Sequence, residues 1–210
     1  MIAAADFILL ILSSPSGAGK TTLTRMLLSQ CPELLFSVSH TTRAPRNNEV
    51  NGRDYHFVDR KRFLELVSAG AFLEWAEVHG HLYGTSTAEI DRARATEGCN
   101  GMIFDIDYQG ARQIRSKVPD VTAVFILPPS MRELERRLRG RASDAEHAVK
   151  ARFAAAQREI EHYAIFDYVV VNDQLDQAFD ELRSIAVAEH AKRQLRAAVA
   201  ESLLRTGHLG

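Results

Sequence analysis

The most specific chemical signal in this chain is a glycine-rich stretch, Ser14-Pro-Ser-Gly-Ala-Gly-Lys-Thr21, which has the spacing of a Walker A loop. Glycines let backbone N–H groups curl around phosphate oxygens, and the helix that follows such a loop adds a favourable dipole. The Lys20 ammonium suits the β- and γ-phosphates of a nucleotide, and the Thr21 hydroxyl suits Mg²⁺. Ser14 replaces the usual first glycine, at a turn that serine can also adopt. The sequence therefore predicts a nucleotide phosphate site at Ser14, Pro15, Ser16, Gly17, Ala18, Gly19, Lys20, Thr21 and Thr22.

Two arginines and two tyrosines form a second set of candidate phosphate ligands. Arg43 and Arg46 carry planar donor groups that suit a phosphate dianion. Tyr55 and Tyr83 offer hydroxyl donors to the same group. Taken alone, arginines in a polar loop are more often surface charge. Their assignment therefore depends on the surrounding sequence, Thr41-Thr-Arg-Ala-Pro-Arg46.

Two carboxylates, Asp105 and Asp107, end an apolar stretch that predicts a buried strand. Residues two apart on a strand point to the same face, and α/β proteins bind ligands at the carboxyl ends of parallel strands. Carboxylates there are costly unless a cation or hydrogen-bond donors satisfy them. We assign this pair to the water shell of Mg²⁺ and to a bound substrate, and the sequence does not divide the two roles between them.

The elements that must hold these residues alternate between strands and helices. Continuous apolar runs predict central strands at 7–12, 102–107, 121–127 and 168–171. The pattern of apolar residues predicts a helix over 20–30, and further helices start near Ser130, Ser143 and Asp176. Such alternation predicts an α/β fold, in which helices cover both faces of a parallel sheet.

Residues 36–78 have a different sequence pattern, in which short strand-like pieces at 36–40, 54–58 and 71–78 are separated by polar turns. One short helix is predicted between them, capped by Asp59 and ended by Gly70. Farther on, Ser86-x-x-Glu89 has the spacing of a capping box for a helix that Gly98 would end. This part of the chain is expected to be a small, mainly antiparallel insertion.

Several separate motifs resemble the guanylate kinase family. The family pattern S-x-T-T-R-x-P-R, then G-x-x-Y-x-F, is matched by Ser39, Thr41-Thr-Arg43, Pro45-Arg46, Gly52, Tyr55 and Phe57. Further matches are Phe72-Leu-Glu-Trp75, Tyr83-Gly-Thr85, Asp105-Ile-Asp-Tyr-Gln-Gly110, Pro128-Pro-Ser130, Arg137-Leu-x-Gly-Arg141, Arg152 and Val171-Asn-Asp173. The resemblance extends from about Ile8 to His190, in one order and with near-constant spacing, so chance agreement is negligible.

This resemblance implies a guanylate kinase, which transfers the γ-phosphate of ATP to GMP, and to dGMP, by direct in-line, magnesium-assisted transfer. It implies a P-loop NTPase-type parallel sheet flanked by helices, with a GMP-binding insertion and a helical lid. The expected core comprises 1–36, 92–129 and 164–210, the GMP-binding region comprises 37–91, and the lid comprises 130–163.

The resemblance also implies how GMP is recognised. The expected GMP-binding residues are Ser39, Arg43, Arg46, Tyr55, Glu74, Tyr83, Thr85, Asp105 and Asp107. Glu74 is the candidate for base choice, because guanine presents N1–H and its N2 amino group as adjacent donors, whereas adenine turns a lone pair toward a carboxylate. The hydroxyls of Ser39 and Thr85 are expected to reach guanine O6.

Phosphoryl transfer requires positioning and neutralisation of charge on the transferring oxygens. The expected catalytic residues are Lys20, Arg43, Arg137, Arg141 and Arg152. Mg²⁺ is expected at Thr21 and Asp105, largely through water, and Asn172 is expected to contact ATP on the adenine side. Ala142 and His40 depart from the residues usual in the family, and His40 is expected to pack rather than to touch the nucleotide.

Charge, cysteine content and hydropathy indicate which partners and which cellular location to expect. The chain of 210 residues carries a net charge of −1, from 26 basic and 27 acidic residues, which argues against a nucleic-acid partner. Cys31 and Cys99 lie far apart and are predicted to be buried free thiols. The apolar run 7–12 is too short to span a bilayer and follows no basic residue, so we expect no signal peptide, no membrane partner and a cytoplasmic location.

Near the C-terminus, Leu195, Val199 and Leu203 recur every four residues, which predicts an amphipathic helix. That helix either packs on the core or contacts another subunit, so both a monomer and a homo-oligomer remain open. His79 and His81 have no evident third ligand, and we interpret them as turn-side residues rather than as a metal pair.

Three other functions compete with this interpretation. A kinase of the same fold with a different phosphate acceptor is disfavoured by Glu74, Ser39 and Thr85. A non-catalytic binding module related to guanylate kinases tends to lose the phosphate loop, whereas Lys20 and Thr21 are present here. A P-loop GTPase would carry an Asn-Lys-x-Asp motif, which this sequence lacks.

Overall fold

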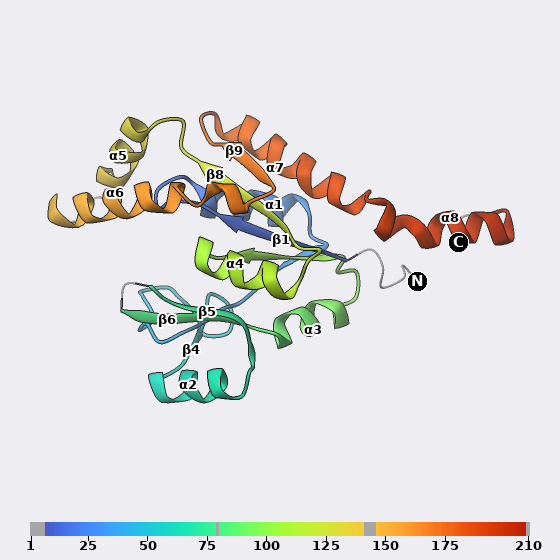
Figure 1. Ribbon diagram of the computed structural model, residues 1–210, viewed down its shortest axis with the longest axis horizontal. Helices are drawn as coiled ribbons and strands as arrows, with labels where there is room; N and C mark the ends of the chain where they lie inside the picture. Colours follow the sequence, from blue (N-terminus) through green and yellow to red (C-terminus); the bar gives the residue numbers. More distant parts are fainter. Residues whose placement is uncertain (1–6, 79, 141–145, 209–210) are drawn as a thin grey trace.

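The computed structural model describes residues 7–78, 80–140 and 146–208, and a parallel sheet of five strands forms its centre (Figure 1). All neighbouring strands in this sheet are parallel. In spatial order the strands are β2 (Leu34–Phe36), β7 (Gly101–Asp105), β1 (Ile8–Ser13), β8 (Thr122–Leu127) and β9 (Tyr168–Val171). The predicted α/β class is confirmed, and β1, which leads into the phosphate loop, lies in the middle of the sheet.

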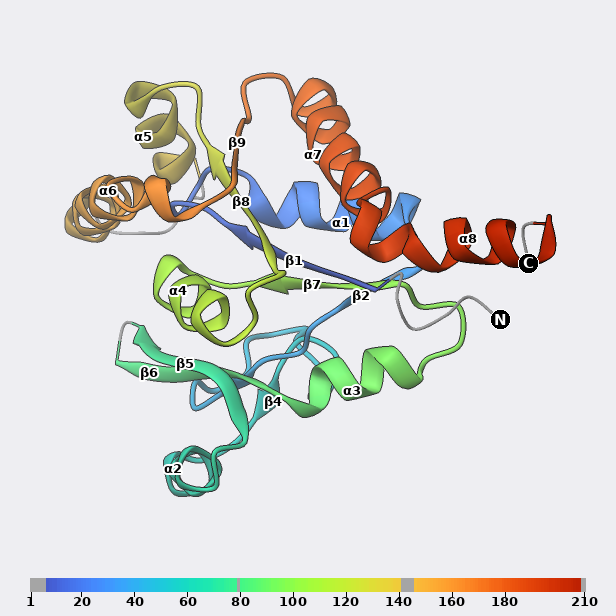
Figure 2. The same cartoon turned by 45° about the vertical axis from the view of Figure 1, so that its right-hand side comes forward.

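Helices lie on both sides of this sheet (Figures 1 and 2). In chain order, the helices of the described residues, including those outside the central layers, are α1 (Lys20–Gln30), α2 (Arg60–Ser68), α3 (Ala88–Ala95), α4 (Tyr108–Lys117), α5 (Met131–Arg139), α6 (Glu146–Ile160), a short 3₁₀ turn η2 (Tyr163–Ile165), α7 (Leu175–His190) and α8 (Arg193–Thr206). The helices expected over 20–30 and from near Ser130 and Asp176 are present, and Ser143 lies outside the described residues.

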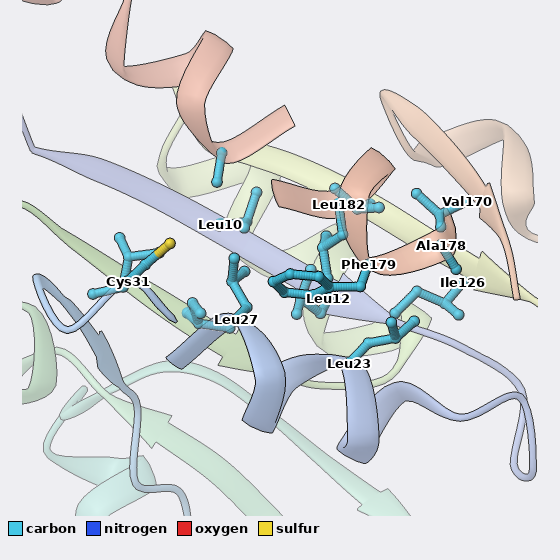
Figure 3. Packing of buried hydrophobic residues seen from close by; sticks show 14 of the residues in the cluster. Leu10, Leu12, Leu23, Leu27, Cys31, Ile126, Val170, Ala178, Phe179 and Leu182 are labelled. Carbon is cyan, nitrogen blue, oxygen red and sulfur yellow. The ribbon is translucent and has the colours of Figure 1, made fainter. Parts of the chain in front are cut away.

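The two faces of β1 are buried against different helices, which explains its continuous apolar sequence. Leu10 and Leu12 pack in one cluster with Phe179 of α7 and with side chains of α1 (Figure 3). Leu9 and Ile11 belong to a second cluster on the opposite face, which includes side chains of α3 and α4. Because both faces are covered, β1 is held rigidly and fixes where the loop after it begins.

A second sheet of four strands forms the insertion. In spatial order its strands are β4 (His56–Phe57), β3 (His40–Thr41), β6 (His81–Ser86) and β5 (Phe72–Val78). The pairs β5–β6 and β3–β6 are antiparallel, and β3–β4 is parallel. The strand expected at 36–40 was wrong as one unit, because residues 37–39 separate β2 of the central sheet from β3 of this one. Asp59 caps α2 as predicted, by accepting a hydrogen bond from the backbone N–H of Arg62.

The capping box predicted at Ser86 and Glu89 is wrong. The N-cap of α3 is Thr87, whose side chain makes no capping hydrogen bond. Glu89 is buried and accepts a hydrogen bond of 2.8 Å from the backbone N–H of Val38. Satisfying a buried N–H from a distant segment therefore takes precedence over the local capping pattern.

Two helical parts extend beyond the central layers. Helices α5 and α6 pack against each other through a small apolar cluster of their own. Helix α8 projects away from the sheet (Figures 1 and 2), with Leu195 packed near the core but Val199 and Leu203 exposed.

Cys31 is buried as expected, whereas Cys99 is only partly buried, and neither forms a disulfide. In the part of the chain that the structure describes, no helix has the length and apolar character needed to cross a membrane.

We expect Gly101→Ala to destabilise the protein by about 1–3 kcal/mol, because cores resist added atoms. A Cβ at this buried position of β7 would lie 2.6 Å from Cγ1 of Ile8 and 2.6 Å from Cδ2 of Leu34, so side chains of both neighbouring strands would have to shift. Equilibrium unfolding in urea measures the change. The control is Gly140→Ala, whose Cβ would meet its nearest atom at an ordinary 3.4 Å. Equal stability of the Gly101→Ala variant and the unmodified chain would contradict this account of the sheet.

Candidate active site

A cavity of about 200 Å³ lies where the second sheet faces the end of β7. Its wall contains residues that the sequence analysis assigned to two different substrates, and the fold brings them together. These residues are Lys20, Ser39, Tyr55, Glu74, Tyr83, Asp105 and Asp107. A small molecule in this cavity would therefore lie within reach of both a candidate base-reading carboxylate and the phosphate-loop lysine.

The phosphate loop runs from the end of β1 to the first turn of α1, as the motif predicts. Gly19 has φ of +100°, and a Cβ at this position would overlap the side-chain amide of Asn172. Asn172 is buried and donates a hydrogen bond of 2.7 Å to the carbonyl oxygen of Ala18, so it braces the loop from behind. Among the described residues other than glycine, only Asn48 has a positive φ, so Ser14 takes the first loop position without backbone strain.

Lys20 and Asp105 form an ion pair at the mouth of the loop. Asp107 has a different role from the one that the strand pattern predicted. The strand ends at Asp105, and Asp107 is the N-cap of α4, where its carboxylate accepts hydrogen bonds from the backbone N–H groups of Gln109 and Gly110. The same-face argument for the two carboxylates was therefore wrong, although both line the cavity. An aspartate at a helix start satisfies free N–H groups, which ends the strand two residues early.

Glu74 is the most buried carboxylate in the cavity wall. The residue is 4% exposed, and its carboxylate accepts a hydrogen bond of 2.7 Å from Oγ1 of Thr85, which in turn lies 3.2 Å from Oγ of Ser39. Burial raises the pKa of Glu74 to about 7, and the hydrogen bond from Thr85 opposes that rise. The three residues therefore form a hydrogen-bonding surface, of which the carboxylate is charged near neutral pH only in part.

Arg43 lies beside the cavity rather than in its wall. It forms an ion pair of 2.8 Å with Glu49, and its guanidinium lies 5.4 Å from the centre of the Tyr55 ring. The hydrogen bond to Glu49 raises the pKa of Arg43. Arg46 is exposed, and only its backbone N–H is described in contact with Glu49. The structure thus brings Arg43, Tyr55 and Tyr83 together but does not bring the Arg46 side chain to them.

Helices α5 and α6 bring arginines to the other side of the phosphate loop. Arg137 donates to the carbonyl oxygens of Asn172 and Ala18, at 3.1 Å and 3.4 Å. Arg152 donates a hydrogen bond of 2.9 Å to Oγ of Ser16. A second cavity of about 420 Å³ opens here, lined by Gly17, Gly19, Thr22, Arg136, Arg137, Gly140, Asn172, Asp173 and Leu175. Arg141 and Ala142 lie outside the described residues.

The described residues contain no group of three or more His, Cys, Asp and Glu side chains that would hold a metal ion alone. Thr21 at the start of α1 and Asp105 at the end of β7 do offer oxygen donors beside the loop, which Mg²⁺ prefers. A site with few protein ligands fits Mg²⁺, because this ion keeps several waters and binds substrate phosphates.

Two of the histidines singled out in the sequence, His40 and His81, are not part of the cavity wall. His40 packs against the rings of His56 and Phe72, at 4.6 Å and 5.4 Å between ring centres. Burial lowers the pKa of His40 to about 4, and the neighbouring His56 adds to this effect. His79 lies outside the described residues, and His81 is exposed.

Three residues that contact the site were missed by the sequence analysis. Glu49 pairs with Arg43, Lys117 donates to the backbone carbonyl oxygen of Leu73 beside Glu74, and Glu159 of α6 accepts from the phosphate loop. Each one lies in a charged, polar stretch with no motif of its own, so no local pattern distinguishes it from surface charge. Only Glu49, three residues from Arg46, had a signal in its closeness to the arginine motif.

Comparison with known proteins decides the family. The family model described as guanylate kinase matches residues 8–189. The chain belongs to the guanylate kinase family. A guanylate kinase of Myxococcus xanthus (strain DK1622) is 51% identical over 188 residues, which cover 89% of each chain. A guanylate kinase of Dechloromonas aromatica (strain RCB) is 48% identical over 200 residues, covering 93% of this chain and 98% of the relative.

A solved structure agrees with this family assignment. The crystal structure of guanylate kinase from Anaplasma phagocytophilum superposes with a TM-score of 0.76 at 35% sequence identity, and the match covers 95% of each chain. The resemblance inferred from the motifs of the sequence is therefore confirmed for both family and fold.

Replacing Glu74 by Gln is expected to change how stability depends on pH. Between about pH 4.5 and 7 the unfolded chain has lost the Glu74 proton while the folded chain retains it, so the free energy of unfolding falls as the pH rises. Glutamine cannot ionise, so the stability of Glu74→Gln relative to the unmodified chain should increase across this window, by up to about 3 kcal/mol. Urea unfolding at pH 5, 6, 7 and 8 measures the difference, and a difference independent of pH would contradict the raised pKa.

Proposed function

We propose that this chain is a magnesium-dependent guanylate kinase that transfers the γ-phosphate of ATP to GMP, and to dGMP, giving ADP and GDP. The observation that carries the proposal is the cavity that joins the buried Glu74 carboxylate to Lys20 and Asp105. A base-reading group and a phosphate-loop lysine in one cavity fit a monophosphate acceptor whose phosphate points toward the donor.

Glu74 reads the guanine base in this proposal. Its carboxylate accepts hydrogen bonds from guanine N1–H and the N2 amino group, while the hydroxyls of Thr85 and Ser39 face O6. The hydrogen bond of 2.7 Å from Thr85 to Glu74 supports this, because it fixes the carboxylate at one edge of the cavity. Adenine would set its N1 lone pair against the carboxylate and leave a buried charge without a donor, which is a strong basis for rejection.

The GMP phosphate is held by Arg43, Arg46, Tyr55 and Tyr83. Support comes from the contact of Arg43 with the Tyr55 ring and from the two tyrosines in the cavity wall. Arg43 is paired with Glu49, so we propose that the phosphate dianion takes over part of that pairing when GMP binds. Arg46 is exposed and would have to swing toward the phosphate.

ATP is held by the phosphate loop, residues 14–22, with its adenine near Asn172. The cavity of about 420 Å³ lined by Gly19 and Asn172 supports this, because it adjoins the loop and Glu74 is not part of its wall. Lys20 neutralises charge on the β- and γ-phosphates. Arg43, Arg137, Arg141 and Arg152 stabilise the charge that spreads over the transferring oxygens, and no phospho-enzyme is formed.

Mg²⁺ is the proposed cofactor, bound by ATP and by Thr21 and Asp105, largely through water. When bound, it supplies positive charge that neutralises the phosphate oxygens. Asp105 has a second task in this proposal, namely to keep Lys20 at the mouth of the loop, and the ion pair between the two residues supports it.

The two sheets and the helix pair, α5 and α6, have separate roles in this proposal. We propose that residues 37–91 bind GMP, that residues 130–163 act as a lid which excludes water during transfer, and that the remainder forms the core. We further propose a cytoplasmic protein that acts on small molecules, as a monomer or a homo-oligomer, with no nucleic-acid or membrane partner. The near-balance of 26 basic and 27 acidic residues supports the absence of a polyanionic partner.

The reaction is tested by ADP release from ATP and Mg²⁺, with GMP, AMP, CMP and UMP assayed in parallel. We expect turnover with GMP and rates at least about a hundredfold lower with the other three, because each lacks guanine's paired donors. A chelator should abolish the activity and added Mg²⁺ should restore it. ADP release that is independent of the acceptor, or equal with AMP, would reject the proposed function.

The base assignment is tested with Glu74→Gln, using Glu77→Gln as a matched control on the same strand. Glu77 is exposed and pairs only loosely with Arg60, at 3.5 Å. We expect Glu74→Gln to lower kcat/KM for GMP about a hundredfold or more, because the amide presents its own donors to those of guanine. Glu77→Gln should change it by no more than about twofold, since exposed pairs contribute little. Equal kcat/KM in the two variants would move base reading away from Glu74.

A further inference from the structure

A carboxylate of the helix pair is in direct contact with the phosphate loop. Oε2 of Glu159, on α6, accepts a hydrogen bond of 3.2 Å from the backbone N–H of Ser16, although 143 residues separate them in sequence. Arg152 lies two turns earlier on the same helix and donates to the hydroxyl of Ser16. Helix α6 therefore contacts one loop residue through two groups, and neither contact exists unless the helix is packed close to the loop.

The partner of Glu159 is a group of the kind that this loop uses to bind phosphate. Backbone N–H groups of a Walker A loop point at an anion, and a carboxylate is an anion of the same sign as a phosphate oxygen. Glu159 is also the only carboxylate of α6 that is described in contact with the loop. The loop thus contacts an anion supplied by its own chain.

The electrostatic surroundings of Glu159 are mixed. Burial raises the pKa of its carboxyl, and the nearby Asp107 adds to the rise, whereas the Ser16 N–H, Lys20 and Arg158 oppose it. The carboxylate is therefore tolerated because the cationic loop offsets part of its desolvation. ATP would bring several negative charges to the same loop, and like charges at close range disfavour each other.

We propose that the Glu159 carboxylate is an internal stand-in for nucleotide phosphate, which docks α6 on the phosphate loop in the free enzyme and leaves Ser16 when ATP binds. This inference rests on the proposed function, in which the loop binds ATP. It makes Glu159 a determinant of ATP affinity, because every binding event must break the contact. It also couples nucleotide binding to the helix that carries Arg152, since release of Glu159 frees α6 to move relative to the loop.

The alternative is that Glu159 is a permanent strut that shapes the loop for ATP. The two ideas predict opposite effects on ATP affinity when the carboxylate is removed. A strut, once lost, leaves a looser loop and weaker binding. A competing anion, once lost, leaves the loop open and gives tighter binding.

The test is isothermal titration of the full chain with ATP, without GMP, for Glu159→Gln and Glu159→Ala. We expect Glu159→Ala to bind ATP about five- to thirtyfold more tightly than the unmodified chain, because a hydrogen bond to a charged acceptor no longer competes. Glu159→Gln should lie between the two, since its amide oxygen still accepts from Ser16 but carries no charge. Adenosine, which has no phosphate, should bind all three proteins equally. Unchanged or weaker ATP binding by Glu159→Ala would overturn the proposal.

Two controls separate this outcome from a folding defect and from a wrong function. Glu161→Gln, at an exposed position two residues along the chain, should bind ATP like the unmodified protein. The adenosine titration reports whether the neighbouring cavity is intact in each variant, so a misfolded variant would lose both ligands. Failure of the function itself would appear as absence of GMP-dependent ADP release by the unmodified chain, which the binding experiment does not use.

Discussion

The ion pair between Lys20 and Asp105 joins the two parts of the chain that the rest of the site depends on. Lys20 begins the helix after β1, and Asp105 ends β7, and the two strands are neighbours in register, with Leu12 opposite Asp105. Parallel strands deliver their carboxyl ends to one edge of the sheet, so these oppositely charged groups meet without any local sequence relation. The insertion then needs only to cover this edge for Glu74, the proposed base-reading group, to share a cavity with the phosphate-loop lysine.

The same principle extends to two other cations of the site, Arg43 and Arg137, which are also paired with carboxylates of the protein. Arg43 is paired with Glu49, and Arg137 with Glu133, and both contacts are at hydrogen-bonding distance. Unpaired cations gathered around one cavity would repel each other, so internal carboxylates allow the site to exist before the substrates arrive. The proposed phosphates then exchange with these partners, and the net affinity for a nucleotide is a difference between two sets of ion pairs rather than the strength of one.

The sequence predicted those parts of the site that short motifs and apolar patterns encode. The phosphate loop, the strand before it and the helix after it follow from local residue types, and so does the edge of the sheet at which Asp105 lies. The role of Asp107 could not be predicted from strand periodicity, because a helix cap and a strand residue compete for the same position. Glu89 and Glu159 were out of reach for another reason. Each satisfies a backbone N–H in a distant segment, 51 and 143 residues away, and local patterns do not report such contacts.

Glu74 shows how specificity and stability oppose each other in this fold. The Glu74 carboxyl is buried beside Thr85, and its pKa is raised to about 7. Near neutral pH it therefore lowers the stability of the folded state, because it ionises less readily there than in the unfolded chain. The same burial would make a mismatched base unfavourable, because the charge of the Glu74 carboxylate would then have neither a hydrogen-bond donor nor water beside it. Guanine, with two adjacent donors, would favour the ionised form and so lower the pKa of Glu74 on binding. The binding of guanine would then offset the free-energy cost of ionising the buried Glu74 carboxylate. A base without those donors would leave that cost in place.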